Sequence, residues 1–439
     1  MKIAVLGYGI EGESLVKYFR ARTSQVTIFY YTNNKTAASS PINHLPKAVE
    51  AINVGSINGF AGLDFKGYDR VYRTANILPT MLKVKTHLSS LTQEFFDHCP
   101  AQIIGVTGTK GKGTTSSLIA VILEAAGKKV WLVGNIGKPA LDVLPKIEKD
   151  DYVVFELSSF QLQDLQKSPH IAVMLMIVED HMDAHADMEE YVAAKKQIFA
   201  HQGPADKAIY CDDNEISKAA VQFSRAESRL PFSNQLYLPN GVSERAGWIW
   251  YGAEPIVAVS DIPLLGRHNL QNVAAAIAAT WEIVGDKEVI IRAVKSFKPL
   301  PHRLEVVATS AGVRYIDDSI STNPATAIAA IESLDEPKIL ILGGSDKGHD
   351  FTQLAAAIAK SNVKQVVLMG EMAARIAKCL AVANYHHFQQ ADGLKQAVRL
   401  SRQAAQAGDV VLLSPACASF DMFTGYAQRG DAFRAACEL

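Results

Sequence analysis

A glycine-rich stretch in the first third of the chain has the residue types and spacing that bind phosphate. Residues 103–118 contain four glycines: they begin with an apolar run, continue through a glycine-rich loop, and end in a run that predicts a helix from Leu118 to Ala126. Glycines let main-chain N–H groups approach phosphate oxygens, while Lys112 can reach the β- and γ-phosphates. An ordinary strand-to-helix turn rarely needs so many glycines beside a lysine. The expected ATP-binding residues of this loop are Gly108, Thr109, Lys110, Gly111, Lys112, Gly113, Thr114 and Thr115.

A magnesium site is expected beside this loop. The residue after Lys112 is Gly113, where a Ser or Thr usually binds the ion, so the hydroxyl must come from Thr114 or Thr115, and we favour Thr114. Glu156 ends the apolar run 152–156, and its carboxylate suits a hard cation that prefers oxygen ligands. The alternative for Glu156 is a solvated acid at a strand end.

The elements that must position these residues follow an α/β pattern. Short β-branched runs alternate with Ala-rich helical stretches, which is typical of doubly wound parallel sheets. Expected strands are 3–6, 26–29, 103–107, 130–133, 152–156, 172–177, 338–342, 365–369 and 409–413. Breaks near Pro100 and at the two prolines of 298–301 predict three domains, 1–96, 97–298 and 299–439. We expect a Rossmann-like first domain, a central parallel sheet of the P-loop ATPase type and a Rossmann-like third domain.

Composition excludes several function classes. Lys and Arg total 44 against 45 for Asp and Glu, so there is no bias toward nucleic acid or membranes. The longest apolar stretches, such as 171–178, are too short to cross a bilayer, and no basic leader precedes the first strand. Five scattered cysteines without a Cys-x-x-Cys pair predict neither disulfides nor zinc. We therefore expect a cytoplasmic protein without membrane insertion or nucleic-acid partner.

Further motifs occur in a fixed order along the chain, and together with the phosphate loop they resemble those of the Mur ligase family. They are residues 134–137, 156–162, 179–183, 191–195, 266–272, 300–303 and 414–419. The resemblance extends over the whole chain and is strongest from residue 103 onward. It implies a ligase in peptidoglycan synthesis: ATP converts a carboxylate into an acyl phosphate, which the amine of glutamate attacks. The implied substrates are UDP-N-acetylmuramoyl-L-alanine and D-glutamate, with ATP, two Mg²⁺ ions and a monomeric enzyme.

The resemblance also implies a role for two histidines and a lysine. His181 helps to hold the second magnesium or the substrate; a zinc site with His185 is not expected, because the His-Glu-x-x-His pattern is absent. His185 is expected to be a surface or capping residue. Lys195 would ordinarily be a solvated surface lysine. The matching lysine of Mur ligases is carbamylated and binds magnesium, which replaces a positive charge by a negative one.

The remaining site residues are implied in the same way. Catalysis is assigned to Lys112, Glu156, His181 and Lys195, and metal binding to Thr114, Glu156, His181 and Lys195. Asn269 and Asn272 match amides that bind adenine, although each could simply cap a helix. Arg303 and Asp318 match positions that hold ATP from the third domain after domain closure. Substrate contacts are expected from Gly9, Ile10, Glu11, Asn135, Ser158, Ser159, Gln161, His181, Thr322, Lys347, Ser419 and Tyr426.

Two segments depart from the family pattern. Residues 7–12 form a G-x-G-x-x-G after a strand, but no acid ends the second strand at 29–32, so UDP is expected there rather than NAD. Residues 73–76 replace the usual Ser-Pro-Gly. Ile320 stands where the family has a lysine near the incoming amino acid, which predicts a high KM for D-glutamate or a changed preference.

Three alternatives stay open from the sequence. The chain could add another amino acid, such as L-glutamate. It could resemble folylpolyglutamate synthases, which have a similar loop at Lys112-Gly113 but lack this first domain. It could also be a catalytically weak paralogue that binds nucleotide only.

Overall fold

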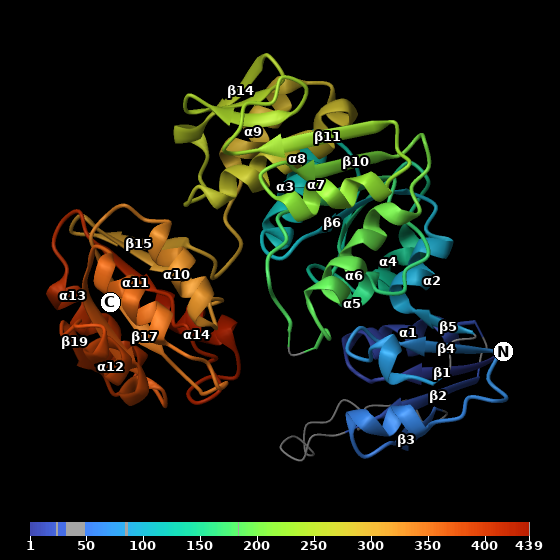
Figure 1. Ribbon diagram of the computed structural model, residues 1–439, viewed down its shortest axis with the longest axis horizontal. Coiled ribbons are helices and arrows are strands. Elements are labelled where there is room, and N and C mark those ends of the chain that lie inside the picture. The colour runs from blue at the N-terminus through green and yellow to red at the C-terminus, as the bar shows by residue number, and fades with distance from the viewer. Residues whose placement is uncertain (23–24, 32–48, 84–86, 183, 439) are drawn as a thin grey trace. The chain divides into compact units, whose positions relative to one another are not determined.

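The computed structural model describes residues 1–22, 25–31, 49–83, 87–182 and 184–438 (Figure 1). Thr32 and Asp183, which belong to two of the sequence motifs, lie outside these ranges. The chain divides into two compact units, Met1–Ile262 with Leu270–Phe297 and Pro263–Asn269 with Lys298–Leu439. Its described strands form three α/β sheets, two in the first unit and one in the second, which confirms the predicted fold class. The predicted boundaries at 96 and 298 stay predictions.

The first sheet is parallel, in the order β3-β2-β1-β4-β5. Its strands are β1 (Lys2–Leu6), β2 (Gln25–Tyr30), β3 (Glu50–Asn53), β4 (Arg70–Arg73) and β5 (Leu88–Ser90), with helices α1 (Ile10–Arg20) and α2 (Leu91–His98). The turn from β1 into α1 requires glycine, because a Cβ on Gly12 would lie 2.4 Å from the carbonyl oxygen of Gly7. The sequence pattern did not indicate β3, β4 or β5, which are three or four residues long and carry polar ends.

The central sheet has the order β14-β13-β12-β11-β10-β9-β6-β8-β7. Its strands are β6 (Gln102–Thr107), β7 (Val130–Gly134), β8 (Tyr152–Glu156), β9 (Ile171–Met174), β10 (Lys207–Cys211), β11 (Ser228–Ser233), β12 (Val242–Arg245), β13 (Trp248–Tyr251) and β14 (Glu254–Ala258). It is not wholly parallel as expected, because β12, β13 and β14 pair antiparallel. Ala246 and Gly247, with φ of 52° and 78°, make the tight turn between β12 and β13 that such a hairpin needs.

The helices of the central part are α3 (Lys112–Ala125), α4 (Ala140–Val143), α5 (Ser159–Leu162), α6 (Met188–Ala200), α7 (Glu215–Ala220), α8 (His268–Val284) and α9 (Lys287–Ser296). Helix α3 begins six residues earlier than expected, directly at Lys112, because Gly111 caps it with a φ of 85°. Strand β9 ends earlier than expected, since the chain after Met174 leaves the sheet, and the N–H of Thr109 donates to the carbonyl of Met176.

The third sheet has the order β15-β16-β20-β17-β18-β19, parallel except for the β15-β16 hairpin. Its strands are β15 (Glu305–Ser310), β16 (Val313–Asp317), β17 (Lys338–Gly343), β18 (Val363–Met369), β19 (Phe388–Gln390) and β20 (Val410–Leu413). The helices are α10 (Pro324–Glu332), α11 (Thr352–Lys360), α12 (Ala373–Val382), α13 (Leu394–Ala404) and α14 (Tyr426–Cys437). Among the described helices, none has the length and apolar character required to cross a membrane.

Candidate active site

The phosphate loop lies between β6 and α3, at the carboxyl edge of the central sheet. Gly111 must be glycine, because a Cβ there would lie 2.2 Å from Oδ1 of Asn272. The hydroxyl of Thr115 donates to the same Oδ1 at 3.2 Å, so α8 packs directly on the loop. The Lys112 ammonium donates to the carbonyls of Gly108 and Thr109 at 3.1 and 2.9 Å. Asn272 therefore shapes the loop as well as being a candidate adenine ligand.

Lys195 is not the solvated lysine that its helix alone would predict. Its side chain is 1% exposed on α6, and Nζ donates to the carbonyl of Gly108 at 2.8 Å. Burial and the nearby Lys112 ammonium hold the pKa of Lys195 well below its usual range, against the opposing attraction of Asp180 and Glu156. Lys112, Glu156 and Lys195 therefore lie close enough to influence one another electrostatically.

Tyr191 and Asp180 also lie near Lys195, although their sequence positions alone indicated no role. Tyr191 lies one helical turn before Lys195, whose Nζ is 4.7 Å from the centre of the tyrosine ring. The Tyr191 and Thr109 hydroxyls are 3.1 Å apart, and burial raises the pKa of Tyr191 to about 12. The i, i+4 spacing of Tyr191 and Lys195 was the available signal, because such residues share one helix face.

Oxygen donors suited to magnesium lie beside the loop. Glu156 ends β8, which pairs with β6, and its side chain is largely buried. The N–H of Asn135 donates to the Glu156 carbonyl at 3.2 Å, so two predicted site residues are adjacent. Thr114 is buried in the first turn of α3. A carboxylate and a hydroxyl at the phosphate loop fit the preferences of Mg²⁺.

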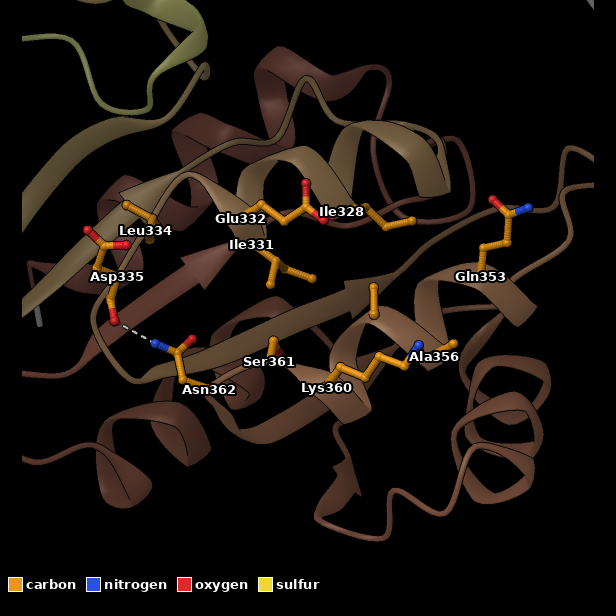
Figure 2. A pocket seen from close by; sticks show the side chains of 11 residues that line it. Ile328, Ile331, Glu332, Leu334, Asp335, Gln353, Ala356, Lys360, Ser361 and Asn362 are labelled. Carbon is orange, nitrogen blue, oxygen red and sulfur yellow. Dashed lines mark hydrogen bonds between the residues drawn. The ribbon is translucent and has the colours of Figure 1, made fainter. Parts of the chain in front are cut away.

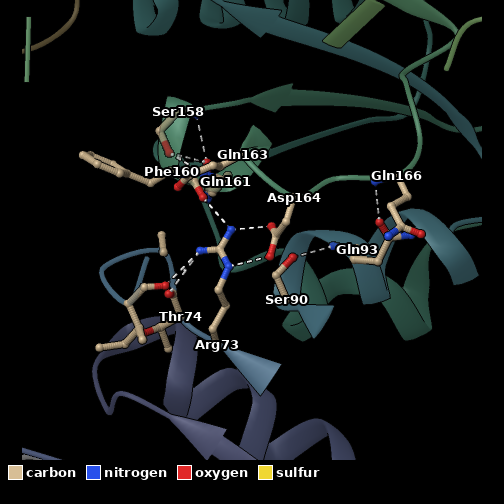
Figure 3. A network of polar contacts seen from close by, with 12 residues as sticks. Arg73, Thr74, Ser90, Gln93, Ser158, Phe160, Gln161, Gln163, Asp164 and Gln166 are labelled. Atoms are coloured by element: carbon tan, nitrogen blue, oxygen red, sulfur yellow. Dashed lines mark hydrogen bonds and ion pairs between the residues drawn. The ribbon is translucent and has the colours of Figure 1, made fainter. Parts of the chain in front are cut away.

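Residues 158–164 join this site to the first sheet (Figure 3). Gln161 caps α5 reciprocally with Ser158, and its Nε2 donates at 3.0 Å to Oε1 of Glu11. The other oxygen of Glu11 accepts from the N–H of Ala75 at 2.7 Å. Glu11, Ser158 and Gln161 are therefore brought together. Gly9 and Ile10 lie beside them. A Cβ added to Gly9 would meet no atom within 4 Å, and the side chain of Ile10 is exposed.

Arg73, the first residue of the departing segment 73–76, is a buried internal contact. Its side chain is fully buried, and Nε donates to Oδ2 of Asp164 at 2.6 Å. A second nitrogen donates to the Phe160 carbonyl at 2.8 Å and also contacts Asp164 (Figure 3). No local sequence pattern predicts this pair, because the two residues lie 91 positions apart.

The two histidines of the segment after β9 differ in environment. His181 has a φ of 58° and a half-exposed side chain, and its ring lies 5.3 Å from that of Phe160. The expectation that His185 lies at the surface is wrong. Its ring is buried, stacks on Phe160 at 5.2 Å, and places Nε2 3.0 Å from the hydroxyl of Ser159. The His185 ring is buried because it packs against two aromatic rings, although its polar character had predicted a surface position.

In the second unit, the candidate amino-acid contacts lie on loops after three neighbouring strands. Thr322 follows β16, Lys347 follows β17 and Ser419 follows β20, and these strands are adjacent in the sheet. Tyr426 begins α14, and its carbonyl accepts from the hydroxyl of Ser319 at 2.8 Å. The carboxyl edge of a parallel sheet is where such folds bind ligands. The Lys347 ammonium is exposed and lies 5.9 Å from the Phe420 ring.

The candidate ATP contacts of this unit lie on the same edge. Asp318 accepts from the Ser414 hydroxyl at 2.8 Å, and burial raises its pKa to about 6 against the attraction of Arg303. Nε of Arg303 is buried and has no hydrogen-bond partner among the described residues, so it can donate to a ligand. Asn269 donates to the Leu265 carbonyl at 2.6 Å.

A separate groove of about 610 Å³ lies at the opposite edge of this sheet, between α10 and α11 (Figure 2). Asp335 and Asn362, which precede β17 and β18, close one end, where the Asn362 amide donates to the Asp335 carbonyl at 2.5 Å. None of the predicted site residues lines it. The groove is therefore distinct from the candidate active site.

Comparison with known proteins agrees with the ordered motifs. The model of the Mur ligase middle domain matches residues 106–280, and that of the Mur ligase glutamate ligase domain matches 302–417. A UDP-N-acetylmuramoylalanine–D-glutamate ligase of Symbiobacterium thermophilum is 37% identical, over 100% of this chain and 98% of its own length. The chain belongs to the Mur ligase family. A ligase of the same name from Acetivibrio thermocellus is 35% identical, over 99% of this chain and 95% of its own.

Solved Mur ligases share the fold. The UDP-N-acetylmuramate–alanine ligase of Thermotoga maritima aligns over 100% of this chain and 99% of its own, with a TM-score of 0.62 and 15% identity. A folylpolyglutamate synthase of Mycobacterium tuberculosis, complexed with ADP, covers 79% of this chain and 93% of its own, with a TM-score of 0.56 and 15% identity. At these identities the likeness concerns the fold.

Proposed function

We propose that this Mur ligase joins D-glutamate to UDP-N-acetylmuramoyl-L-alanine in an ATP-driven step of peptidoglycan synthesis. The observation that carries the proposal is the full-length identity of 37% to a ligase of that name. The gathering of Lys112, Glu156 and Lys195 around the phosphate loop supports an active enzyme rather than a nucleotide-binding paralogue. We further propose a monomer that acts in the cytoplasm.

ATP fits the phosphate loop, and Mg²⁺ fits the oxygen donors beside it. Main-chain N–H groups of residues 108–113 and the N-terminus of α3 are suited to the phosphates. Thr114 and Glu156 would hold one Mg²⁺, which neutralises charge on the transferring phosphoryl group when bound. His181 would bind the second ion or the substrate. Arg303 and Asp318 are the proposed ATP contacts of the second unit, with Nε of Arg303 as an available donor.

Lys195 is well placed to be carbamylated. Its lowered pKa favours the neutral amine, whose nitrogen attacks the carbon of CO₂ and loses a proton to give an N-carboxylate. An ammonium at this position would repel magnesium, whereas the carbamate would supply an oxygen ligand. Its neighbour Lys196 contacts the Phe223 ring instead.

The reaction then needs two transfers. The alanyl carboxylate attacks the γ-phosphorus of ATP, and ADP leaves, which gives an acyl phosphate. The amine of glutamate attacks the acyl carbon, phosphate leaves, and a proton is lost from nitrogen as the amide forms. Lys112 would stabilise the negative charge of the phosphoryl group during transfer. The uridine nucleotide would bind near Gly9 and Glu11, and the amino acid near Thr322, Lys347 and Ser419.

Phosphate release from the purified protein tests the proposal. ATP and Mg²⁺ are supplied with UDP-N-acetylmuramoyl-L-alanine, with D-glutamate, with both, or with L-glutamate and other amino acids in its place. We expect phosphate and a product of the added glutamyl mass only with both substrates and the D-isomer. Release with another amino acid would replace D-glutamate as the substrate, and release with a folate acceptor alone would contradict the proposal.

A further inference from the structure

One arginine of the second unit is buried without an acidic partner. Arg429, on α14, is 0% exposed. Its guanidinium donates to the hydroxyl and carbonyl of Ser319 at 3.0 and 2.9 Å, and to the carbonyls of Cys417 and Ala418 at 3.0 and 3.2 Å. All these acceptors are neutral, so hydrogen bonding is satisfied while the positive charge is not neutralised by contact. A buried charge of this kind is costly.

Two carboxylates attract the Arg429 charge but, among the described residues, form no ion pair with it. Asp317 and Asp421 favour the charge of Arg429 by electrostatic attraction, but within the described ranges neither forms an ion pair or hydrogen bond with it. Asp317 is instead engaged with His302 Nδ1 at 2.7 Å. Burial lowers the pKa of Arg429 to about 10, which leaves it charged at neutral pH.

The contacts of Arg429 join three loops at the carboxyl edge of the sheet. Ser319 lies on the loop after β16, and Cys417 and Ala418 lie on the loop after β20. The loop after β17 is joined to them, because the Ser345 N–H donates to the Ala418 carbonyl at 2.9 Å. A Cβ on Gly344 would lie 3.1 Å from the guanidinium, so the three loops converge on Arg429.

These loops carry the candidate amino-acid contacts. Ser319 precedes Ile320 and Thr322, Ala418 precedes Ser419, and Gly344 precedes Lys347. The inference rests on the proposed function, in which an amino acid with two carboxylates binds here. An anionic ligand at this edge would offset the charge that no described carboxylate contacts. Ile320 itself is apolar and supplies no charge to the same edge.

We propose that Arg429 is a positioning residue for the incoming acidic amino acid: it holds the three loops in register and supplies a positive potential for the substrate carboxylates. Its effect is expected on binding of the dicarboxylate, because its four hydrogen bonds go to loops that carry the candidate amino-acid contacts, and none among the described residues goes to Arg303 or Asp318. Loss of a unit charge near a ligand carboxylate, at the dielectric of a partly buried site, weakens binding by about tenfold or more.

Steady-state kinetics on Arg429→Met and Arg429→Lys tests this. For Arg429→Met we expect KM for D-glutamate to rise about tenfold or more, with KM for ATP and for the UDP-linked substrate within about twofold of wild type. Arg429→Lys keeps the charge and should show a much smaller rise. Equal rises in all three KM values, or equal effects of both substitutions, would mean a purely structural role and overturn the proposal.

A second substitution keeps the proposal testable if Arg429→Met does not fold. Ile320→Lys places a charge on the same loop edge, so Arg429→Met combined with Ile320→Lys should recover much of the D-glutamate KM. Thermal unfolding shows which variants fold; if Arg429→Met does not, Arg429→Gln, which also lacks the charge but keeps hydrogen-bond donors, takes its place with and without Ile320→Lys. An unchanged KM for D-glutamate in Arg429→Gln overturns the proposal. If wild type does not use D-glutamate at all, the proposed function fails instead.

Discussion

Nε of Arg73 donates to Oδ2 of Asp164 at 2.6 Å across 91 residues of sequence. Arg73 ends β4 of the first sheet, and Asp164 follows α5 of the central part. Because the arginine side chain has no exposure and that of Asp164 is 24% exposed, the pair is largely shielded from water. It fastens the segment 158–164, which carries candidate substrate contacts, to the first sheet.

Arg73→Met should destabilise the protein by about 3 kcal/mol, because Asp164 would keep a partly buried charge without its partner. The free energy of unfolding in urea measures this. Lys17→Met is the matched control, since Lys17 pairs with Glu13 on the exposed face of α1 and its loss should cost less than about 1 kcal/mol. Similar losses in the two variants would mean that burial does not strengthen the Arg73 pair.

Lys195→Ala should lose at least about a hundredfold in kcat if the proposed carbamate binds Mg²⁺ in the transition state. Acetate or formate should restore part of the activity by replacing the carbamate. Lys112→Ala is the control and should not respond to carboxylates, because it removes a cation. Mass spectrometry in bicarbonate should detect the carbamate on wild type. Full activity of Lys195→Ala without bicarbonate would show that Lys195 has only a structural role.

Asp318→Asn should change how stability depends on pH. The pKa of this carboxyl is about 6 in the folded state against 3.8 ordinarily, so the unfolded chain loses its proton first as pH rises. Wild type therefore carries a penalty that is absent well below pH 3.8 and complete above pH 6. The unfolding free energy of the variant relative to wild type should rise by about 1.5 kcal/mol from pH 5 to pH 8.

The control for that titration is Asp335→Asn, because Asp335 is an exposed acid of the same unit. Its difference from wild type shows how much of the pH dependence comes from removing any exposed carboxyl of this unit. A flat difference for Asp318→Asn would show that the folded and unfolded pKa values of Asp318 are alike.

His185→Phe should raise KM for the UDP-linked substrate about three- to tenfold, with a small effect on stability. The variant keeps the stacking on Phe160 but loses the contact with Ser159, so the loop that carries Ser158 is held less firmly. Steady-state kinetics and thermal unfolding measure both effects. His201→Phe serves as the control at an exposed position. An unchanged KM would show that Ser159 is positioned without His185.

The first sheet should bind UDP and not NAD. No acid follows β2 at Tyr30 and Tyr31 to contact a ribose. Calorimetric titration of the whole protein with UDP and with NAD compares the two ligands. Tight binding of NAD without binding of UDP would contradict the assignment of this nucleotide site.

The chemistry of the site could be predicted from local sequence. The phosphate loop, its lysine and the strand that ends at Glu156 form from contiguous residues, and glycine content and hydrophobic periodicity report contiguous structure directly. The expected strands correspond to β1, β2, β6, β7, β8, β9, β17, β18 and β20. Most strands of three or four residues give too few alternating positions to be seen, and the five- and six-residue strands β10, β11, β14, β15 and β16 were also missed.

Only the tertiary structure decided which polar side chains are buried. Lys195, His185, Arg73 and Arg429 are charged or polar residues whose burial no local sequence pattern predicted, and the side chain of each is buried in the structure. Their partners, such as Asp164 for Arg73 and Ser319 for Arg429, are selected by the packing of sheet and helix. Burial depends on neighbours in space rather than in sequence, and it is burial that lowers the pKa of Lys195 and leaves the charge of Arg429 without a contacting anion.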